Sequence, residues 1–243
     1  MYMAKTLQEW IETDVSKVHD RSMQWLSEEH FFRDPNRPLY SDSSYFFAPA
    51  DGVILYSKVV KADESIVDIK GKSYSLQDAM RKKAYNKESL VIGIFMTFYD
   101  VHVNRIPYSG RLSYEELETI SSHNLPMLDI EKNLIDALQL NTANAEYLFG
   151  NQRMLNTVFS MELQHEYYIL QIADYDVDCI TPFRLKQHKN FAQNQRFSQI
   201  RYGSQVDLII PLSKHLDYTP LLEAGMHVEA GIDPVVKISK KQG

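Results

Sequence analysis

Gly203 and Ser204 form the dipeptide in this sequence that could best carry out a chemical reaction. They stand directly before the largely apolar residues 205–210. A serine hydroxyl can attack the carbonyl carbon of the preceding residue and turn the peptide bond into an ester. Elimination and hydrolysis then leave a pyruvoyl group where the serine stood. Glycine at position 203 would let the backbone strain and leave its carbonyl open to attack. The same dipeptide is common in plain turns that lead into strands, so its surroundings decide between the two interpretations.

A carboxylate lies in the rigid sequence Pro49-Ala50-Asp51-Gly52, at the entrance of a predicted strand over residues 53–56. Asp-Gly pairs are frequent in turns, so Asp51 could have a structural role alone. The alternative is that Asp51 acts as a general base, or as a carboxylate that orients a histidine.

Polar side chains also follow the longest apolar run, residues 90–99. Strand alternation would place Asp100, His102 and Asn104 on one face. Histidine is suited to proton transfer near neutral pH, although one of the eight histidines at such a place can be incidental. Arg105 could bind an anion such as a carboxylate or a phosphate.

Several common site motifs are missing from the sequence. There is no H-x-x-x-H or C-x-x-C spacing, so we predict no metal site. There is also no G-x-S-x-G, Walker A or G-x-G-x-x-G motif. A standard serine hydrolase or nucleotide-binding protein is therefore not indicated.

Composition sets further bounds. The chain has 243 residues, 44% of them hydrophobic, which is enough for a sizeable core in one large or two small domains. Its net charge of −6 argues against a nucleic-acid partner, although residues 81–83 form a local basic patch. The single Cys179 suits a reducing compartment and is expected to be a small buried hydrophobe. No signal peptide is visible, and the longest apolar run is too short to span a membrane.

The spacing of apolar residues predicts a helical segment over residues 5–32, within a proposed N-terminal unit 1–32 that precedes a larger domain 33–243. This helix carries both tryptophans but a mostly acidic polar face, so it either packs on the body of the protein or lies at a membrane surface.

The remaining sequence, residues 33–243, predicts an α+β, mainly β fold with a β barrel or sandwich-like core. The predicted strands are residues 53–56, 66–69, 90–99, 166–173, 200–202, 205–210 and 235–238, and the predicted helices are 76–84, 114–118 and 130–138. Gly225 and Gly231 indicate tight turns around a short β segment.

Six motifs, in this order, resemble the phosphatidylserine decarboxylase family, most closely its shorter bacterial and archaeal branch. The similarity covers the chain from about residue 31 to its end. The motifs lie at residues 31–35, 49–52, 70–76, 100–107, 151–153 and 196–204.

The resemblance implies a proenzyme that cuts itself between Gly203 and Ser204. The products would be a β chain of residues 1–203 and an α chain of residues 204–243 that begins with a pyruvoyl cofactor made from Ser204. Asp51 and His102 match catalytic positions of the family. Arg105 stands where the family's second histidine is expected, which leaves the identity of the self-cleavage base open.

The implied reaction converts phosphatidylserine into phosphatidylethanolamine and CO₂. The pyruvoyl carbonyl would form a Schiff base with the substrate amine and take up the charge of the carbanion at Cα. His102 would then supply a proton, and Arg105 and Asn104 would bind the substrate, Arg105 at its phosphate. The expected partners are the phospholipid, the second chain of the same precursor, and the inner face of the cell membrane, reached from the cytoplasm; a homo-oligomer is also possible. The alternatives are a soluble amino acid or another serine-headgroup lipid as substrate, or a non-catalytic homologue.

Overall fold

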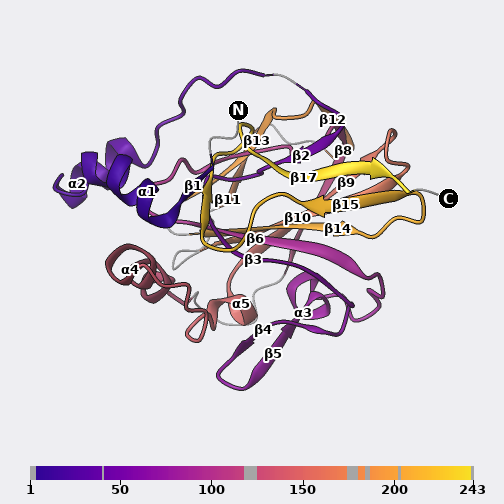
Figure 1. Cartoon of the computed structure of the whole chain (residues 1–243), viewed down its shortest axis with the longest axis horizontal. Helices are drawn as coiled ribbons and strands as arrows, with labels where there is room; N and C mark the ends of the chain where they lie inside the picture. The colour runs from indigo at the N-terminus through magenta and orange to yellow at the C-terminus, as the bar shows by residue number, and fades with distance from the viewer. Residues whose placement is uncertain are drawn as a thin grey trace.

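The centre of the protein is a nine-stranded sheet, seen in a computed structural model that describes residues 4–39, 41–117, 125–173, 180–183, 187–201 and 204–241 (Figure 1). All of its neighbouring strands pair antiparallel. In spatial order the strands are β1 (Lys5–Thr6), β16 (Met226–Val228), β3 (Gly52–Val60), β6 (Ser89–Met96), β14 (Ser204–Pro211), β10 (His165–Ala173), β9 (Arg153–Ser160), β8 (Gly110–Leu117) and β12 (Lys189–Phe191).

Smaller elements cover both faces of this sheet. The smaller sheets are β11 (Ile180–Pro182), β13 (Arg196–Ile200) and β7 (Val103–Arg105); β15 (Leu216–Pro220), β17 (Pro234–Lys240) and β2 (Tyr45–Phe47); and the hairpin β4 (Ser65–Ile69) with β5 (Lys72–Ser75). The α-helices are α1 (Leu7–Thr13), α2 (Met23–Trp25), α3 (Leu76–Met80), α4 (Leu128–Ala137) and α5 (Tyr147–Gly150). Residues Val15–Lys17 form a 3₁₀ turn, and Leu26–His30 form a π turn.

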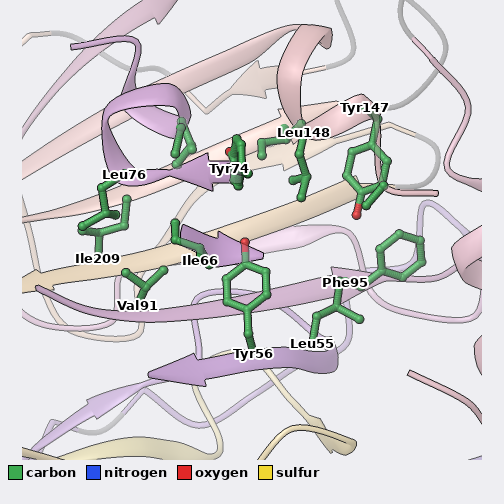
Figure 2. Packing of buried hydrophobic residues seen from close by; sticks show 14 of the residues in the cluster. Leu55, Tyr56, Ile66, Tyr74, Leu76, Val91, Phe95, Tyr147, Leu148 and Ile209 are labelled. Atoms are coloured by element: carbon green, nitrogen blue, oxygen red, sulfur yellow. The ribbon is translucent and has the colours of Figure 1, made fainter. Parts of the chain in front are cut away.

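Two hydrophobic cores lie on opposite faces of the central sheet. Side chains alternate between the faces, so that Ile92 and Ile94 of β6 enter one core while Val91 and Phe95 enter the other. The first core also receives residues of β2, β13 and β17. In the second, side chains of β3, β6 and β14 meet those of the hairpin, α3 and α5 (Figure 2). Burial on both faces explains why these strands appear in the sequence as nearly continuous apolar runs.

The α+β, mainly β prediction is confirmed, with 17% helix and 42% strand. Within the described residues no sheet closes into a barrel, and the smaller sheets instead pack over the central one. The predicted strands correspond to β3, β4, β6, β10, β14 and β17, and two of the predicted helices to α3 and α4. The strand predicted over residues 200–202 meets β13 at Ile200 alone. The predicted turns around β16 are also present, with Gly225 and Gly231 at φ values of 92° and 71°.

Two predictions of local structure are wrong. Residues 114–117 belong to strand β8, because pairing with β9 outweighs a short local helix pattern. The single helix expected over residues 5–32 is divided into β1, α1, α2 and the two turns. Capping by Thr6 and Ser22 starts new helical segments there, since each side chain accepts a backbone N–H bond. Glu118, Cys179, Tyr202 and Gly203 lie outside the described residues.

Among the described residues, no helix has both the length and the apolar character needed to cross a bilayer. The division into units 1–32 and 33–243 stays a prediction.

Candidate active site

Ser204 is the first residue of β14, where it pairs with Met96 of β6 and Ala173 of β10. Its side chain is fully buried, and its hydroxyl Oγ lies 3.6 Å from the sulfur of Met96. Directly paired residues place their side chains on the same face of a sheet. Ser204 therefore faces the core that lies under the small sheet of β7, β13 and β11.

Asn104 of β7 meets Ser204 at the same sulfur atom. Its Nδ2 lies 3.7 Å from Met96 Sδ, and its Oδ1 accepts a 2.6 Å hydrogen bond from Gln171 Nε2. Gln171, on β10, also donates to Ser198 of β13 at 3.0 Å. This buried polar link fixes the small sheet on the central one, because each buried polar atom in it needs its partner. Two motifs 100 residues apart are thus brought side by side.

His102 is fully buried directly before β7 and has a defined tautomer. Its Nδ1 lies 3.1 Å from the backbone oxygen of Asp100, which can only accept, so Nδ1 carries the hydrogen. The other nitrogen, Nε2, then holds a lone pair, and it has no hydrogen-bond partner within the described residues. The ring packs on Phe31 with 3.9 Å between the centroids. Nε2 of His102 is therefore available to accept a proton.

Burial lowers the pKa of His102 to about 4, although the negative charges of Asp100 and Asp51 act in the opposite direction. The imidazole is therefore neutral at physiological pH. A neutral ring with a free Nε2 takes up a proton before it can return one, which differs from the simple proton donor expected from the sequence.

Asp100 and His227 form a second buried pair beside His102. His227 Nε2 lies 2.7 Å from Asp100 Oδ1, and Thr97 donates two hydrogen bonds of 2.8 Å to the other carboxylate oxygen. Burial would raise the pKa of Asp100, but the charge and hydrogen bond of His227 keep it below the usual value. The ring of His227 is stacked on Trp10 of α1 at 4.5 Å.

This arrangement changes the predicted alternation of Asp100, His102 and Asn104. Strand β7 begins only at Val103, so the three residues do not form one face of a strand. Asp100 reaches His102 through its backbone, while its carboxylate binds elsewhere.

Asp51 is held by an arginine that sequence reasoning did not select. Arg37 forms two hydrogen bonds of 2.6 Å to the two carboxylate oxygens, and the Ala230 N–H adds a third at 2.7 Å. Burial would lower the pKa of Arg37, but the bonds and charge of Asp51 raise it. Asp51 therefore orients Arg37 in this structure. It acts on His102 only through its charge.

Arg105 lines a cavity of about 670 Å³ together with Arg37, Lys189 and Arg196. Its Nη1 donates to the backbone oxygen of Asn194 at 3.1 Å, and its Nε has no hydrogen-bond partner among the described residues. Gly231 makes room for this side chain, because a Cβ at that position would lie 2.8 Å from Arg105 Cδ. Four cations and one carboxylate, Asp34, line this cavity. Asp34 pairs with Arg196 and Arg105, and Arg37 is already paired with Asp51, so a smaller excess of positive charge remains, which would suit an anion.

The structure thus brings Ser204, Asn104, His102 and Arg105 to one region, with Asp51 behind Arg37. Sequence reasoning missed Arg37, His227 and Gln171. Two of them had a signal: Arg37 follows the aromatic motif 31–35, and His227 lies between the glycines at 225 and 231. In the described part of the chain no group of three or more His, Cys, Asp or Glu residues is placed to hold a metal.

A buried serine at a strand start, a neutral imidazole and a cation-lined cavity are features that an acid–base site for an anionic substrate would need. The model of the phosphatidylserine decarboxylase family matches residues 29–235, so the chain belongs to this family. It is a decarboxylase, a carbon–carbon lyase that releases CO₂. The family predicted from the six motifs is confirmed, and the alternative of a non-catalytic homologue is not supported.

Curated relatives match most of the chain at low identity. A phosphatidylserine decarboxylase proenzyme of Erythrobacter litoralis is 28% identical over 213 residues, which is 87% of this chain and 73% of the relative. The corresponding proenzyme of Prosthecochloris aestuarii is 25% identical over 209 residues, 86% of this chain and 76% of the relative. A protein of Methanothermobacter thermautotrophicus, provisionally named an archaetidylserine decarboxylase proenzyme, is 29% identical over 181 residues, which is 74% of this chain and 69% of the relative.

Proposed function

We propose that this chain is a self-processing, pyruvoyl-dependent phosphatidylserine decarboxylase, which makes phosphatidylethanolamine. The observation that carries the proposal is the meeting of Ser204 and Asn104 at the sulfur of Met96. It sets the proposed cleavage site beside the segment that holds His102 and Arg105. The proenzyme names of the relatives support self-processing.

Self-processing begins with attack of Ser204 Oγ on the carbonyl carbon of Gly203. The C–N bond between the two residues breaks and an ester forms. Loss of the Cα proton of residue 204 then expels the carboxylate of Gly203, and water converts the resulting enamine into a ketone with release of ammonia. Both stages need a group that accepts a proton and later returns it, and neutral His102 with its open Nε2 is our candidate.

The buried space that the Ser204 side chain fills suits a pyruvoyl group, which is no larger than the serine residue from which it forms. Such a group supplies an electron-withdrawing carbonyl for the negative charge left by decarboxylation. The chain's own residues do the rest. His102 accepts a proton in this dry site and delivers it to the substrate Cα, and Phe31 keeps its ring in place.

The substrate phosphate fits the cationic cavity of Arg105, Arg37, Lys189 and Arg196. The carboxylate that leaves as CO₂ is better left without a firm cation, because tight ground-state binding would not speed its loss. Asn104 is the neighbour of Arg105 in the chain and shares the sulfur of Met96 with Ser204, which supports a contact with the serine headgroup.

Contact with a membrane is part of the proposal. Large apolar side chains on the segment before Asp51 are exposed: Met23, Phe32 and Leu39 at 66%, 43% and 68% of their surface. Leu39 also lines the cationic cavity. A lipid could therefore present its headgroup from a bilayer at the cytoplasmic face, with these side chains in the interface. A homo-oligomer stays a prediction.

A second candidate substrate is archaetidylserine, the lipid named for the archaeal relative. It bears the same phosphoserine headgroup, so the same cavity would serve. A soluble amino acid is less well matched, because it has no phosphate for Arg105.

The experiment compares the wild type with Ser204→Ala and with Ser239→Ala, a control at an exposed serine of the same proposed α chain. We expect the wild type and Ser239→Ala to give two chains in mass spectrometry, with a pyruvoyl mass at residue 204. Ser204→Ala should stay intact and release no CO₂ from phosphatidylserine vesicles. An intact, active wild type would contradict the self-processing part. CO₂ from free serine but none from phosphatidylserine or archaetidylserine would contradict the lipid substrate.

A further inference from the structure

A second large cavity lies on the other face of the central sheet from Ser204. It has a volume of about 780 Å³ and is bounded by the β4–β5 hairpin, α3 and α5. These elements gather on one side of the molecule in Figure 1, and their apolar residues join the core in Figure 2. Ser204 belongs to the opposite face, with Met96 and Ala173. The two cavities share no lining residue.

Arg81 is the unusual residue in its wall. It ends α3 in the left-handed conformation, with φ 50° and ψ 37°, which is costly for a residue other than glycine. Its Nη2 binds the backbone oxygens of Gly150 and Asn151, both at 3.3 Å. Its Nε and Nη1 are buried and have no hydrogen-bond partner within the described residues. Buried donors without an acceptor are costly, so this guanidinium is suited to an added anion.

The charged side chains around the cavity also favour an anion. Lys70, Lys72, Lys83 and Arg81 line it, against the carboxylates of Asp78 and Glu146. Glu146 is paired with Lys70 at 2.8 Å. Asp78 is engaged in capping α3, where it accepts hydrogen bonds from Ser75. Four cations against two carboxylates leave a local charge of +2 on a chain whose net charge is −6.

Positive charge near Arg81 strengthens the preference of this cavity for an anion. Burial and the neighbouring Arg153 lower the pKa of Arg81 to about 10, so the cation is held at an electrostatic cost. An anion beside it would relieve that cost. A phosphate oxygen beside Nε or Nη1 would supply the acceptor that each of these donors lacks in the described part of the chain.

We propose that the Arg81 cavity is a second anion site, which binds a phosphate group at Arg81, Lys72 and Lys83. The wall also carries Ile69, Leu125 and Phe149, so a phosphate ester with an apolar continuation fits as well as free phosphate. The group could come from a phospholipid headgroup or from a soluble phosphate. The site does not depend on the proposed decarboxylase function, because it shares no residue with the Ser204 region.

The first experiment titrates the full chain with inorganic phosphate at constant ionic strength, in chloride, and follows the melting temperature. Phosphate should stabilise the wild type and Ser204→Ala equally. Arg81→Gln should weaken binding at least tenfold. Arg111→Gln, at an exposed arginine of β8, should change it less than twofold. If Arg81→Gln does not fold, the double variant Lys72→Gln/Lys83→Gln, at exposed side chains, should weaken phosphate binding at least threefold.

The second experiment measures flotation with phosphatidylcholine vesicles, with and without phosphatidylglycerol. Loss of phosphatidylglycerol-dependent binding in Arg81→Gln, with competition by inorganic phosphate, would support the site with a lipid as its ligand. Phosphate binding that needs Arg81 while vesicle binding is unchanged would support the site with a soluble phosphate. Equal phosphate binding by the wild type, Arg81→Gln and the double variant would overturn the proposal, whatever the state of the activity at Ser204.

Discussion

At the residue scale, the most consequential finding is the protonation state of His102. The backbone oxygen of Asp100 fixes the hydrogen on Nδ1, and burial keeps the ring neutral. His102 stands two residues before Asn104, which shares the sulfur of Met96 with the buried Ser204. Arg105, at the position of the second histidine of the family motif, lines the cation-rich cavity, for which we propose the substrate phosphate as ligand.

Because His102 is neutral in the folded chain, the free energy of unfolding should fall measurably in acid. Its pKa is about 4 in the folded chain and about 6.5 when unfolded, so the unfolded state binds more protons between these values. This contribution to stability is complete above pH 6.5 and is lost as the pH falls toward 4. Relative to His102→Gln, the wild type should lose about 2 kcal/mol between pH 7.5 and pH 5, measured by urea unfolding. A difference that does not vary with pH would show that the imidazole is not buried in its neutral form.

Asp51 and Arg37 make a second prediction at this scale. Both side chains are buried, with 5% and 7% of their surface exposed, and removing the Asp51 charge leaves Arg37 with the longer ion pair to Glu229, 3.6 Å away. Asp51→Asn should therefore lower the free energy of unfolding by about 3 kcal/mol. Glu146→Gln, at the exposed ion pair with Lys70, should cost less than about 1 kcal/mol. Equal costs for the two variants would contradict a structural role for the Asp51 pair.

At the scale of elements, strand β14 holds Ser204 by means of a polar network on its other face. Gln205 Nε2 donates to Tyr56 and Asp207 at 2.6 and 2.7 Å, and its Oε1 accepts from Tyr147 at 2.6 Å. Tyr56 and Tyr147 are both visible in Figure 2. Burial raises the pKa of Asp207 to about 6, although the bonds from Gln205 and Tyr56 oppose that change. The network ties β14 to β3 and α5 at the residue next to the proposed cleavage site.

Gly93 of β6 makes room for this network. A Cβ at position 93 would lie 2.3 Å from the ring of Tyr56, so Gly93→Ala must displace Tyr56 from Asp207. We expect a loss of about 3 kcal/mol in unfolding free energy, the upper end for overpacking, and slower chain cleavage. Gly71→Ala is the matched control: it meets no atom within 4 Å and should cost about 1 kcal/mol for its positive φ alone. A Gly93→Ala variant as stable as Gly71→Ala would show that the network is not required.

At the scale of the whole molecule, the proposed α chain is interleaved with the proposed β chain. Its strand β14 lies between β6 and β10, β16 lies between β1 and β3, and β17 pairs with β2. Cleavage before Ser204 would thus cut the backbone without separating the parts, because main-chain hydrogen bonds and both cores still join them.

This interleaving predicts how the processed protein behaves. After cleavage the two chains should elute together in size-exclusion chromatography at any dilution, and separate only in denaturant. The uncleaved Ser204→Ala variant provides the reference elution volume. Release of the smaller chain under native conditions would contradict the arrangement of β14 in the centre of the sheet.

The central strands β3, β6, β14 and β10 could be predicted because they are buried on both faces and so appear as apolar runs, whereas their neighbour β9 was not predicted. The short strands β2, β5, β7 and β12 could not, since each is defined by its partner strand more than by its own residues. The same reason explains the error at residues 114–117. The aromatic motif 31–35 marked the family, but its physical role, with Phe31 stacked on His102, depends on tertiary contact.

The sequence by itself determined the mainly β fold, the family and the Gly203–Ser204 pair, because these depend on residue types and their order along the chain. Only the tertiary structure decided that Asp51 binds Arg37, that the imidazole of His102 is neutral, and that Arg105 lines a cavity with three other cationic side chains. Those properties come from burial and from partners distant in sequence: Asp51 meets Ala230 across 179 positions, and Asp100 meets His227 across 127. A protonation state or an ion pair is set by its surroundings, and folding alone supplies them.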